Sequence, residues 1–321
     1  MAARVGLLVV VTTLLLACGD DAGPADGSEG SMGTVTDPSE AEGSTADPTV
    51  ATGDGPTVDP DGTSGGPVDG TPGCGLALPT GVATVGVQVG SDDRQYLISV
   101  PEGYDPGVPT PLVFAFHGRG GTSELARLYF QVEEASAGEA IFVYPQGLPV
   151  ASMGGQTGWD LGPAGIDVDF FDAMLEQLSE GACIDTARVL VTGHSFGGYM
   201  SNALGCFRAS VLRAIAPVAG GPPFAGCEQG QVAGWMAHGT LDEVVPFSQG
   251  EAARDALLIR NGCSDASAPV DPDPCVSYEG CDEGMPVVWC AHDETDLQGH
   301  TWPSFAGPAI WAFFASLPPA G

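Results

Sequence analysis

Short apolar runs alternate with segments of helical spacing between Cys74 and Gly321. Runs of β-forming residues occur at 111–116, 140–144, 188–192, 213–218, 232–237 and 285–289. Segments predicted to be helical lie at 123–137, 170–178, 248–261 and 306–317. Continuous apolar strands alternating with helices are typical of a parallel sheet with helices on both faces. The pattern therefore predicts an α/β fold.

Two details refine this prediction at the N-terminal side. Residues 82–89 and 94–100 are β-forming runs on either side of a polar turn, which indicates an antiparallel hairpin that opens the sheet. Within 123–137, apolar residues recur at helical spacing, from Leu125 to Ala135, so we expect one helix there.

The first residues resemble a bacterial lipoprotein signal. Arg4 precedes an uncharged apolar run from Val5 to Ala17, which is too short to span a bilayer but suits a signal-peptide core. It ends in Leu-Leu-Ala-Cys-Gly, which resembles a lipobox with Cys18 as the lipidated residue. We expect a signal peptide at 1–17 and membrane attachment through lipid on Cys18. Ordinary secretion with a chance cysteine is the alternative.

Residues 18–73 are predicted to be a disordered tether. They are rich in Asp, Glu, Gly, Pro, Ser and Thr and contain no Lys, Arg or aromatic residue, so they cannot bury enough apolar surface to fold. The acidic segment 59–62 resembles the start of a calcium loop but lacks the later ligands. We therefore expect no metal there, and a single catalytic domain at 74–321.

Charge and cysteine content limit the partners and the compartment. A net charge of -32 with only 9 basic residues argues against nucleic acid or an anionic membrane surface as an electrostatic partner. Nine cysteines indicate an oxidising compartment, and lipidation of Cys18 would leave an even number to pair. Cys183 with Cys206 is the one pairing we propose from sequence. For the cluster 263–290, disulfides are preferred over zinc because no CxxC pair is present.

The strongest chemical motif is Gly193-His194-Ser195-Phe196-Gly197. It follows apolar β-formers and precedes a helix-compatible segment, the context of an α/β-hydrolase nucleophile elbow. A plain glycine-rich turn is the alternative. In this fold an acid and then a histidine follow the serine in the chain. Asp242, just past the strand 232–237, is the predicted acid, with Glu243 as fallback. His300, in a glycine-flanked loop before the last helix, is preferred to His292 as the base.

The remaining site residues come from the loops near this serine. The N–H of Phe196 and that of Arg119, after the strand 111–116, are predicted to form the oxyanion hole, with Gly118 and Gly120 as alternatives to Arg119. Trp159 is a candidate for an exposed wall of a substrate groove or else a packed side chain. Triad chemistry needs no cofactor or metal.

Several segments together resemble the secreted α/β-hydrolases of the polyhydroxybutyrate depolymerase and feruloyl esterase group, related to carbohydrate esterase family 1. The matching segments are 94–96, 101–105, 116–118, 144–147, 158–159, 183–185, 193–195, 238–242, 278–281, 286–290 and 299–303. The resemblance implies ester hydrolysis, carries Ser195, Asp242 and His300 over as the triad, and implies that Trp302 lines an acyl or aromatic pocket. The group often has Asn after the serine, where this chain has Phe196, so acyl preference is open.

We therefore expect an extracytoplasmic serine carboxylesterase that works through an acyl-enzyme. Its expected substrates are feruloyl or acetyl esters on polysaccharide, or hydroxyalkanoate oligomers. A peptidase of the prolyl-oligopeptidase kind is one alternative, although the segment before the hydrolase region reads as a tether and not as a propeller. A non-catalytic binding lipoprotein is the other. Amide cleavage would identify the first, and an unreactive Ser195 the second.

Overall fold

A computed structural model describes residues 70–223, 227 and 230–318. The predicted signal peptide, Cys18, the acidic segment 59–62 and nearly all of the predicted tether lie outside these residues. Gly70 pairs with Asp185, and the backbone N–H of Gly73 donates to the carbonyl of Ser179. The folded region thus extends at least to Gly70. Among the described helices, none combines the length and the apolar character needed to cross a membrane.

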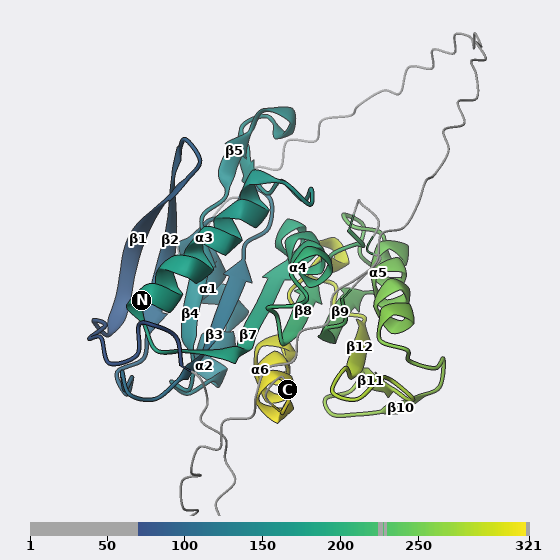
Figure 1. The fold of residues 1–321 in the computed structure, drawn as a ribbon. Helices are drawn as coiled ribbons and strands as arrows, with labels where there is room; N and C mark the ends of the chain where they lie inside the picture. The colour runs from purple at the N-terminus through teal and green to yellow at the C-terminus, as the bar shows by residue number, and fades with distance from the viewer. Residues whose placement is uncertain (1–69, 224–226, 228–229, 319–321) are drawn as a thin grey trace, which may run out of the picture. The chain divides into compact units, whose positions relative to one another are not determined.

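The core of the molecule is a ten-stranded sheet in the order β1-β2-β4-β3-β7-β8-β9-β12-β11-β10 (Figure 1). The strands are β1 (Gly81–Val89), β2 (Asp92–Val100), β3 (Thr110–Phe116), β4 (Ile141–Pro145), β7 (Ile184–His194), β8 (Ala214–Val218), β9 (Ala233–Gly239), β10 (Ser267–Pro269), β11 (Cys275–Tyr278) and β12 (Val287–His292). The central strands from β4 to β12 are parallel, and the expected antiparallel hairpin β1–β2 forms one edge. The predicted α/β-hydrolase fold is confirmed.

Helices cover both faces of this sheet. They are α1 (Ser123–Phe130), α2 (Val132–Ala135), α3 (Ile166–Gly181), α4 (Phe196–Phe207), α5 (Phe247–Arg260) and α6 (Ala306–Ser316). Helices α3, α4 and α5 share one buried cluster with the sheet, and α1, α2 and α6 share a second. Side chains of β3 alternate between the clusters, with Phe114 in the first and Val113 in the second, as the period of a strand requires.

The expected single helix at 123–137 is wrong in one respect. The chain breaks at Gln131, whose φ is 58°, and so forms α1 and α2. The first residues whose spacing predicted the helix do not face the core: Leu125 and Leu128 are exposed, whereas Ala126 and Phe130 are buried. Helix α6 crosses here so closely that a Cβ on Gly307 would lie 2.6 Å from the Phe130 carbonyl oxygen. This contact coincides with the break.

Two small β structures were not expected. A separate antiparallel hairpin joins β5 (Leu148–Val150) to β6 (Gln156–Gly158) where we expected a loop. Strands β10 and β11 extend the far edge of the main sheet. Both are short and carry no clear apolar alternation, and this explains why the sequence pattern did not reveal them.

All eight cysteines of the folded region form disulfides. The pairs are Cys74–Cys183, Cys206–Cys227, Cys263–Cys281 and Cys275–Cys290. The proposed Cys183–Cys206 pair is therefore wrong. The Thr71 hydroxyl bonds to both the Ala182 carbonyl and the Ile184 N–H, and this holds the N-terminal segment beside Cys183. Four disulfides fit an oxidising, extracellular compartment.

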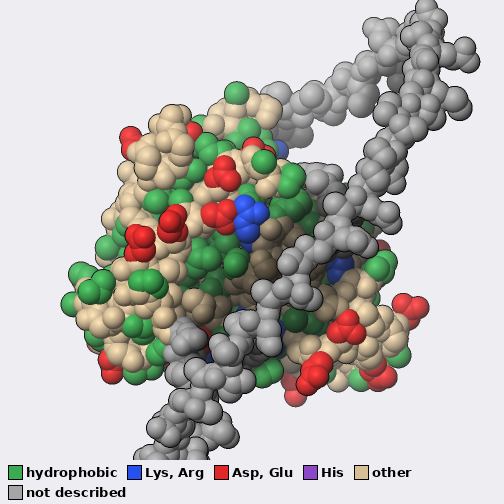
Figure 2. Space-filling model, viewed as in Figure 1, with side chains coloured by type: hydrophobic (Ala, Val, Ile, Leu, Met, Phe, Trp, Pro, Cys, Tyr) green, Lys and Arg blue, Asp and Glu red, His purple; other side chains and the backbone are tan. Residues whose placement is uncertain are grey.

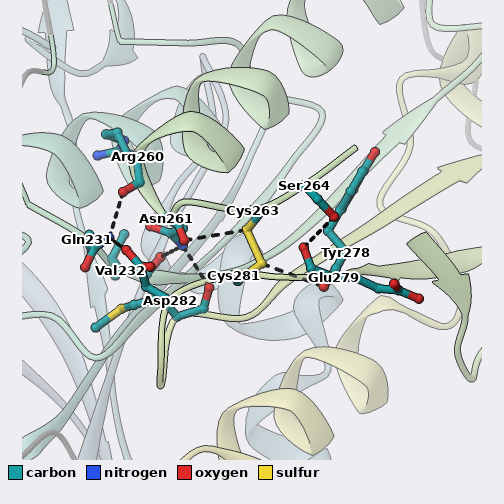
Figure 3. Close-up of a disulfide and its surroundings, with 11 residues drawn as sticks. Gln231, Val232, Arg260, Asn261, Cys263, Ser264, Tyr278, Glu279, Cys281 and Asp282 are labelled. Atoms are coloured by element: carbon teal, nitrogen blue, oxygen red, sulfur yellow. Dashed lines mark hydrogen bonds between the residues drawn. A yellow bond between two sulfur atoms is a disulfide. The ribbon is translucent and has the colours of Figure 1, made fainter. Parts of the chain in front are cut away.

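The cluster 263–290 is a disulfide region and not a zinc site. Figure 3 shows Cys263, just after α5, bonded to Cys281, just after β11. Beside it, the Asn261 side chain donates to the Val232 carbonyl, and the Ser264 hydroxyl donates to the Glu279 carbonyl. These bonds attach the β10–β11 extension to the body of the domain.

Acidic side chains are spread over the visible face, and few basic ones appear (Figure 2). This distribution agrees with the net charge of -32.

Candidate active site

Ser195 occupies a strained turn between β7 and α4. Its φ is 58° and its ψ is -119°, a backbone conformation that non-glycine residues rarely adopt. The turn requires glycine at the positions two before and two after the serine, because any side chain there would overlap nearby backbone. A side chain at Gly193 would overlap the Gly197 carbonyl, and one at Gly197 would overlap the Phe116 carbonyl. The turn holds the serine side chain at the start of α4.

His300 and Asp242 complete a hydrogen-bonded chain with this serine. The His300 Nε2 lies 2.7 Å from the Ser195 Oγ, and its Nδ1 lies 2.7 Å from the Asp242 Oδ2. A carboxylate only accepts, so Nδ1 carries the proton and the Ser195 hydroxyl donates to Nε2 of the neutral ring. Asp242 Oδ1 accepts the N–H groups of Val244 and Val245, each at 2.8 Å. Among the described residues, the Glu243 side chain, the fallback acid, makes no hydrogen bond to His300 or Ser195.

The loops that carry Asp242 and His300 touch through glycines. Gly299 has a φ of 76°, and a side chain there would overlap the Leu241 carbonyl and come within 2.8 Å of the Asp242 nitrogen. A side chain at Gly239 would likewise overlap the Gly299 carbonyl. The N–H of Glu243 donates to the Gln298 carbonyl. This close approach sets the distance between acid and base.

The other four histidines of the chain are also buried. The His238 Nε2 lies 2.9 Å from the Val245 carbonyl and 3.4 Å from Asp242 Oδ2. The His194 ring centre lies 5.0 Å from that of His300. His292, the rival base, has no hydrogen-bond partner for either ring nitrogen among the described residues. His117 lies in the loop that follows β3.

Burial keeps these neighbouring rings neutral. Complete burial lowers the pKa of His194 to about 3. Burial is also the main cause that lowers the pKa values of His117, His238 and His292. The histidine rings near His300 therefore remain uncharged at neutral pH. They do not repel the positive charge that His300 acquires when it accepts a proton.

The start of α4 and the loop after β3 surround the serine with backbone N–H groups. Phe196 is the first residue of α4, where an N–H has no acceptor within the helix. In the loop, the Gly120 N–H donates to Thr157 and the Gly121 N–H donates to Gly118, so Gly120 no longer qualifies as an oxyanion donor. The Arg119 N–H has no acceptor among the described residues. It remains available, as does that of Gly118.

His117 holds this loop in shape. Its Nδ1 donates to the Gly118 carbonyl at 2.7 Å, and its Nε2 accepts the Gly147 N–H at 3.0 Å. The Trp159 Nε1 donates to the His117 carbonyl at 2.8 Å. Trp159 is only 3% exposed, so an exposed position for this side chain is wrong. Its indole N–H instead holds the loop after β3 in place through the hydrogen bond to the His117 carbonyl.

Two cavities are each lined by a residue next to Ser195 in the chain, the first by Phe196 and the second by His194. One, of about 640 Å³, is lined by Leu148, Pro149, Val150, Ala151, Ser152, Met153, Gly158, Trp159, Asp160, Leu161, Gly162, Ile166, Asp167 and Phe196. The other, of about 580 Å³, is lined by Tyr129, Gln131, His194, Leu297, Thr301, Trp302 and Ser304. Trp302 stacks on Phe130 with ring centres 4.2 Å apart. Both volumes suit a small organic ligand.

The arrangement supplies what acyl transfer requires: a hydroxyl nucleophile, a base oriented by a carboxylate, and N–H donors at a helix start. Within the described part of the chain, no group of three or more His, Cys, Asp or Glu side chains is arranged to hold a metal ion.

Curated relatives of this chain support this chemistry. The chain is 34% identical to feruloyl esterase D of Neurospora crassa over 259 residues, which cover 72% of this chain and 85% of the relative. It is 34% identical to feruloyl esterase C of Emericella nidulans over 265 residues, with coverages of 76% and 90%. No protein-family model matches.

The solved structures resemble this one in fold. An acetyl xylan esterase from Aspergillus awamori matches with a TM-score of 0.55 at 15% identity, over 73% of this chain and 99% of that one. A thermostable esterase matches with a TM-score of 0.52 at 17% identity, over 73% and 60%.

Proposed function

The chain belongs to the feruloyl esterase family and is a carboxylic ester hydrolase of the feruloyl and acetyl xylan esterase type, and on this premise we propose that Ser195, His300 and Asp242 are its catalytic triad. The observation that carries the proposal is the pair of 2.7 Å contacts from His300 to Ser195 and to Asp242. Residues from three separate loops meet there in the geometry that nucleophilic catalysis requires.

The reaction then proceeds in two steps. The Ser195 Oγ attacks the ester carbonyl while its proton moves to the His300 Nε2, and Asp242 stabilises the resulting imidazolium. The N–H groups of Phe196 and Arg119 bind the oxyanion. His300 returns the proton to the departing alcohol, and an acyl-enzyme remains. Water, deprotonated by His300, then releases the acid and restores the serine.

We propose a phenolic ester of polysaccharide as the substrate, because the similar curated proteins are named feruloyl esterases. Acetyl esters and hydroxybutyrate oligomers are the competing substrates. Purified enzyme would be assayed with methyl ferulate, p-nitrophenyl acetate, a hydroxybutyrate oligomer and a peptide anilide, beside Ser195→Ala. We expect preference for the ferulate, no anilide cleavage, and no turnover by the variant.

Labelling with a fluorophosphonate gives an independent readout of the serine. Wild type should incorporate one label at Ser195, and Ser195→Ala should incorporate none. Turnover that persists in the variant would refute the triad. An enzyme that is neither labelled nor active on any ester would be a binding protein that has kept the fold.

Membrane attachment through Cys18 is a further part of this proposal. It rests on the short apolar run that ends in a lipobox-like segment. Expressed in a bacterium, the full chain should fractionate with membranes and incorporate labelled palmitate. Cys18→Ala should abolish the label and release the protein. Equal fractionation of the two forms, without label, would indicate ordinary secretion.

A further inference from the structure

The guanidinium of Arg94 links two segments that follow β4 in the chain. Arg94 lies near the start of β2, the neighbour of β4 in the sheet (Figure 1), and it is 1% exposed. Its Nη2 donates to the Gln146 carbonyl at 3.2 Å and to the Asp167 Oδ1 at 2.6 Å. Its guanidinium carbon lies 4.0 Å from the centre of the Phe170 ring. One side chain thus fixes the end of β4 relative to the start of α3.

The first of these segments leads from Gln146 to the imidazole of His117. Gln146 directly follows β4, and the N–H of the next residue, Gly147, donates to the His117 Nε2 at 3.0 Å. The Gln146 carbonyl, which accepts from Arg94, belongs to the same peptide unit as that N–H. Because a peptide unit is planar, the bond from Arg94 also orients the N–H that holds His117.

The second segment leads from Asp167 to the backbone of His117. The Asp167 Oδ2 accepts the N–H of Asp160 at 2.6 Å. That N–H belongs to the peptide unit that joins Trp159 to Asp160, and the Trp159 indole N–H donates to the His117 carbonyl at 2.8 Å. The Trp159 ring centre also lies 4.6 Å from that of the His117 imidazole. Asp167, itself held by Arg94, therefore orients the residue that holds His117 from this side.

Both segments meet on the residue that precedes the proposed oxyanion donor. The His117 Nδ1 donates to the Gly118 carbonyl at 2.7 Å. Gly118 lies against the nucleophile, since a Cβ there would come within 3.3 Å of the Ser195 Cβ. Arg119, whose N–H is the proposed donor, is the next residue. A shift of His117 would therefore move this N–H relative to Ser195.

Building on the proposed triad and oxyanion hole, we propose that Arg94 and Asp167 are positioning residues that act through His117 on the Arg119 N–H. A contribution to stability does not account for the pair. Within the described part of the chain, Nε and Nη1 of Arg94 are buried without a hydrogen-bond partner, which costs free energy. Apolar residues of similar volume often stabilise a fold as well as a buried ion pair does.

A misplaced oxyanion donor has a characteristic kinetic effect. The donor binds the negative oxygen of the tetrahedral intermediate more strongly than the carbonyl oxygen of the bound ester. Loss of its position should therefore lower the rate of acylation and leave ester binding almost unchanged. A variant that only loosens the fold would instead lower the fraction of active molecules.

The test compares Arg94→Met and the double variant Arg94→Met/Asp167→Leu with Arg213→Met as the matched control. Arg213 is also buried, at 4% exposed, and donates to two backbone carbonyls. It directly precedes β8, a strand parallel to β7, so it lies at the opposite end of the sheet from Ser195. Single-turnover acylation by p-nitrophenyl acetate gives the maximal rate and the half-saturating concentration. Rates are expressed per Ser195 titrated with a fluorophosphonate, so unfolded molecules are not counted.

Arg94→Met should lower the maximal acylation rate by about 10-fold or more and change the half-saturating concentration by less than about 2-fold. The inhibition constant of phenylboronic acid should rise by a similar factor, because its tetrahedral adduct uses the same donors. The double variant should unfold at a higher temperature than Arg94→Met, since it buries no unpaired carboxylate, yet acylate as slowly. Arg213→Met should acylate at the wild-type rate.

Recovery of the acylation rate in the double variant would overturn the proposal, because packing would then account for the loss. An unchanged rate in Arg94→Met, or an equal loss in Arg213→Met, would also overturn it. Arg94→Lys serves as a second variant in case Arg94→Met does not fold. Its shorter side chain keeps the charge but not the reach of the guanidinium, so a wild-type rate would again contradict the proposal.

Failure of the underlying triad is a separate outcome. It would appear as turnover by Ser195→Ala or as wild-type protein that the fluorophosphonate does not label.

Discussion

The His300 Nε2 lies 2.7 Å from the Ser195 Oγ, although 105 positions separate the two residues in the chain. The same ring contacts Asp242 on its other side. Strands β7, β9 and β12 end at the same edge of a parallel sheet, so their loops converge there. The predictions below follow from that convergence.

Replacing Asp242 with Asn should remove most of the activity. The amide cannot hold the Nδ1–H tautomer of His300, and loss of the corresponding carboxylate in other triads costs about 10⁴-fold in kcat. Glu243→Gln is the matched control, because Glu243 lies next in the chain and is exposed. Its kcat on methyl ferulate should equal that of wild type. Equal losses in the two variants would show that the acid is misassigned.

Gly299→Ala should impair catalysis through the contact between two loops. The new Cβ would come within 2.8 Å of the Asp242 nitrogen and overlap the Leu241 carbonyl, so the acid would have to shift away from His300. Gly284→Ala separates this effect from backbone strain. Gly284 has the same φ of 76°, but a Cβ there would come no closer than 3.9 Å to another residue, a side-chain nitrogen of Arg213.

Both glycine variants should lose about 1–2 kcal/mol of stability from the left-handed backbone. Only Gly299→Ala should also lose kcat, by about 10-fold or more, since small misplacements of catalytic groups have large effects. Chemical denaturation and steady-state kinetics measure the two quantities. Similar kcat values for the two variants would contradict the proposed role of the contact.

Acid should destabilise the fold through its buried histidines. The pKa of His194 is about 3 in the folded protein and about 6.5 in an unfolded chain. Between these values only the unfolded state takes up the proton, so the free energy of unfolding falls as the pH drops below about 6.5. The lowered pKa values of His117, His238 and His292 act in the same direction.

We therefore expect His194→Gln to lose less thermal stability than wild type between pH 7 and pH 4.5. Carboxylates titrate in both proteins, so they contribute equally to how thermal stability changes with pH. The difference between the two pH dependences therefore reports on His194 alone. Thermal unfolding followed by circular dichroism at several pH values measures it. Parallel slopes would mean that His194 is not held neutral.

The disulfides should differ in their contribution to stability. Cys74–Cys183 closes a separation of 109 residues and Cys275–Cys290 one of 15. Loop-closure entropy assigns about 5 kcal/mol to the longer loop and about 3 kcal/mol to the shorter. Urea unfolding of the two double Cys→Ala variants should give the larger loss for Cys74 and Cys183. A larger loss for the short loop would show that local packing outweighs chain entropy.

Local pattern was sufficient to predict most of the sheet and the elbow at Ser195. Apolar runs predict strands because a strand buried on both faces needs continuous apolar residues. The elbow was recognisable because its glycines are required within five consecutive positions. Asp242 and His300 were predicted from their order and loop context, and they are the residues that the structure brings to Ser195.

Local pattern failed where distant segments decide the outcome. The spacing of Leu125 and Leu128 predicted a helix but not the face it buries, which depends on where α6 crosses. The partner of Cys183 depends on a segment more than a hundred residues earlier. Trp159 is buried because its indole nitrogen meets the carbonyl of His117, a contact between two loops.

The sequence by itself determined the order of the main parallel strands and of most helices between them, the strained serine turn and the candidate triad residues, since local pattern along the chain is enough to indicate them. The tertiary structure alone decided the disulfide partners, the neutral histidines around His300 and the two cavities lined by Phe196 and by His194. Those depend on burial and on the close approach of loops, which only a folded chain creates.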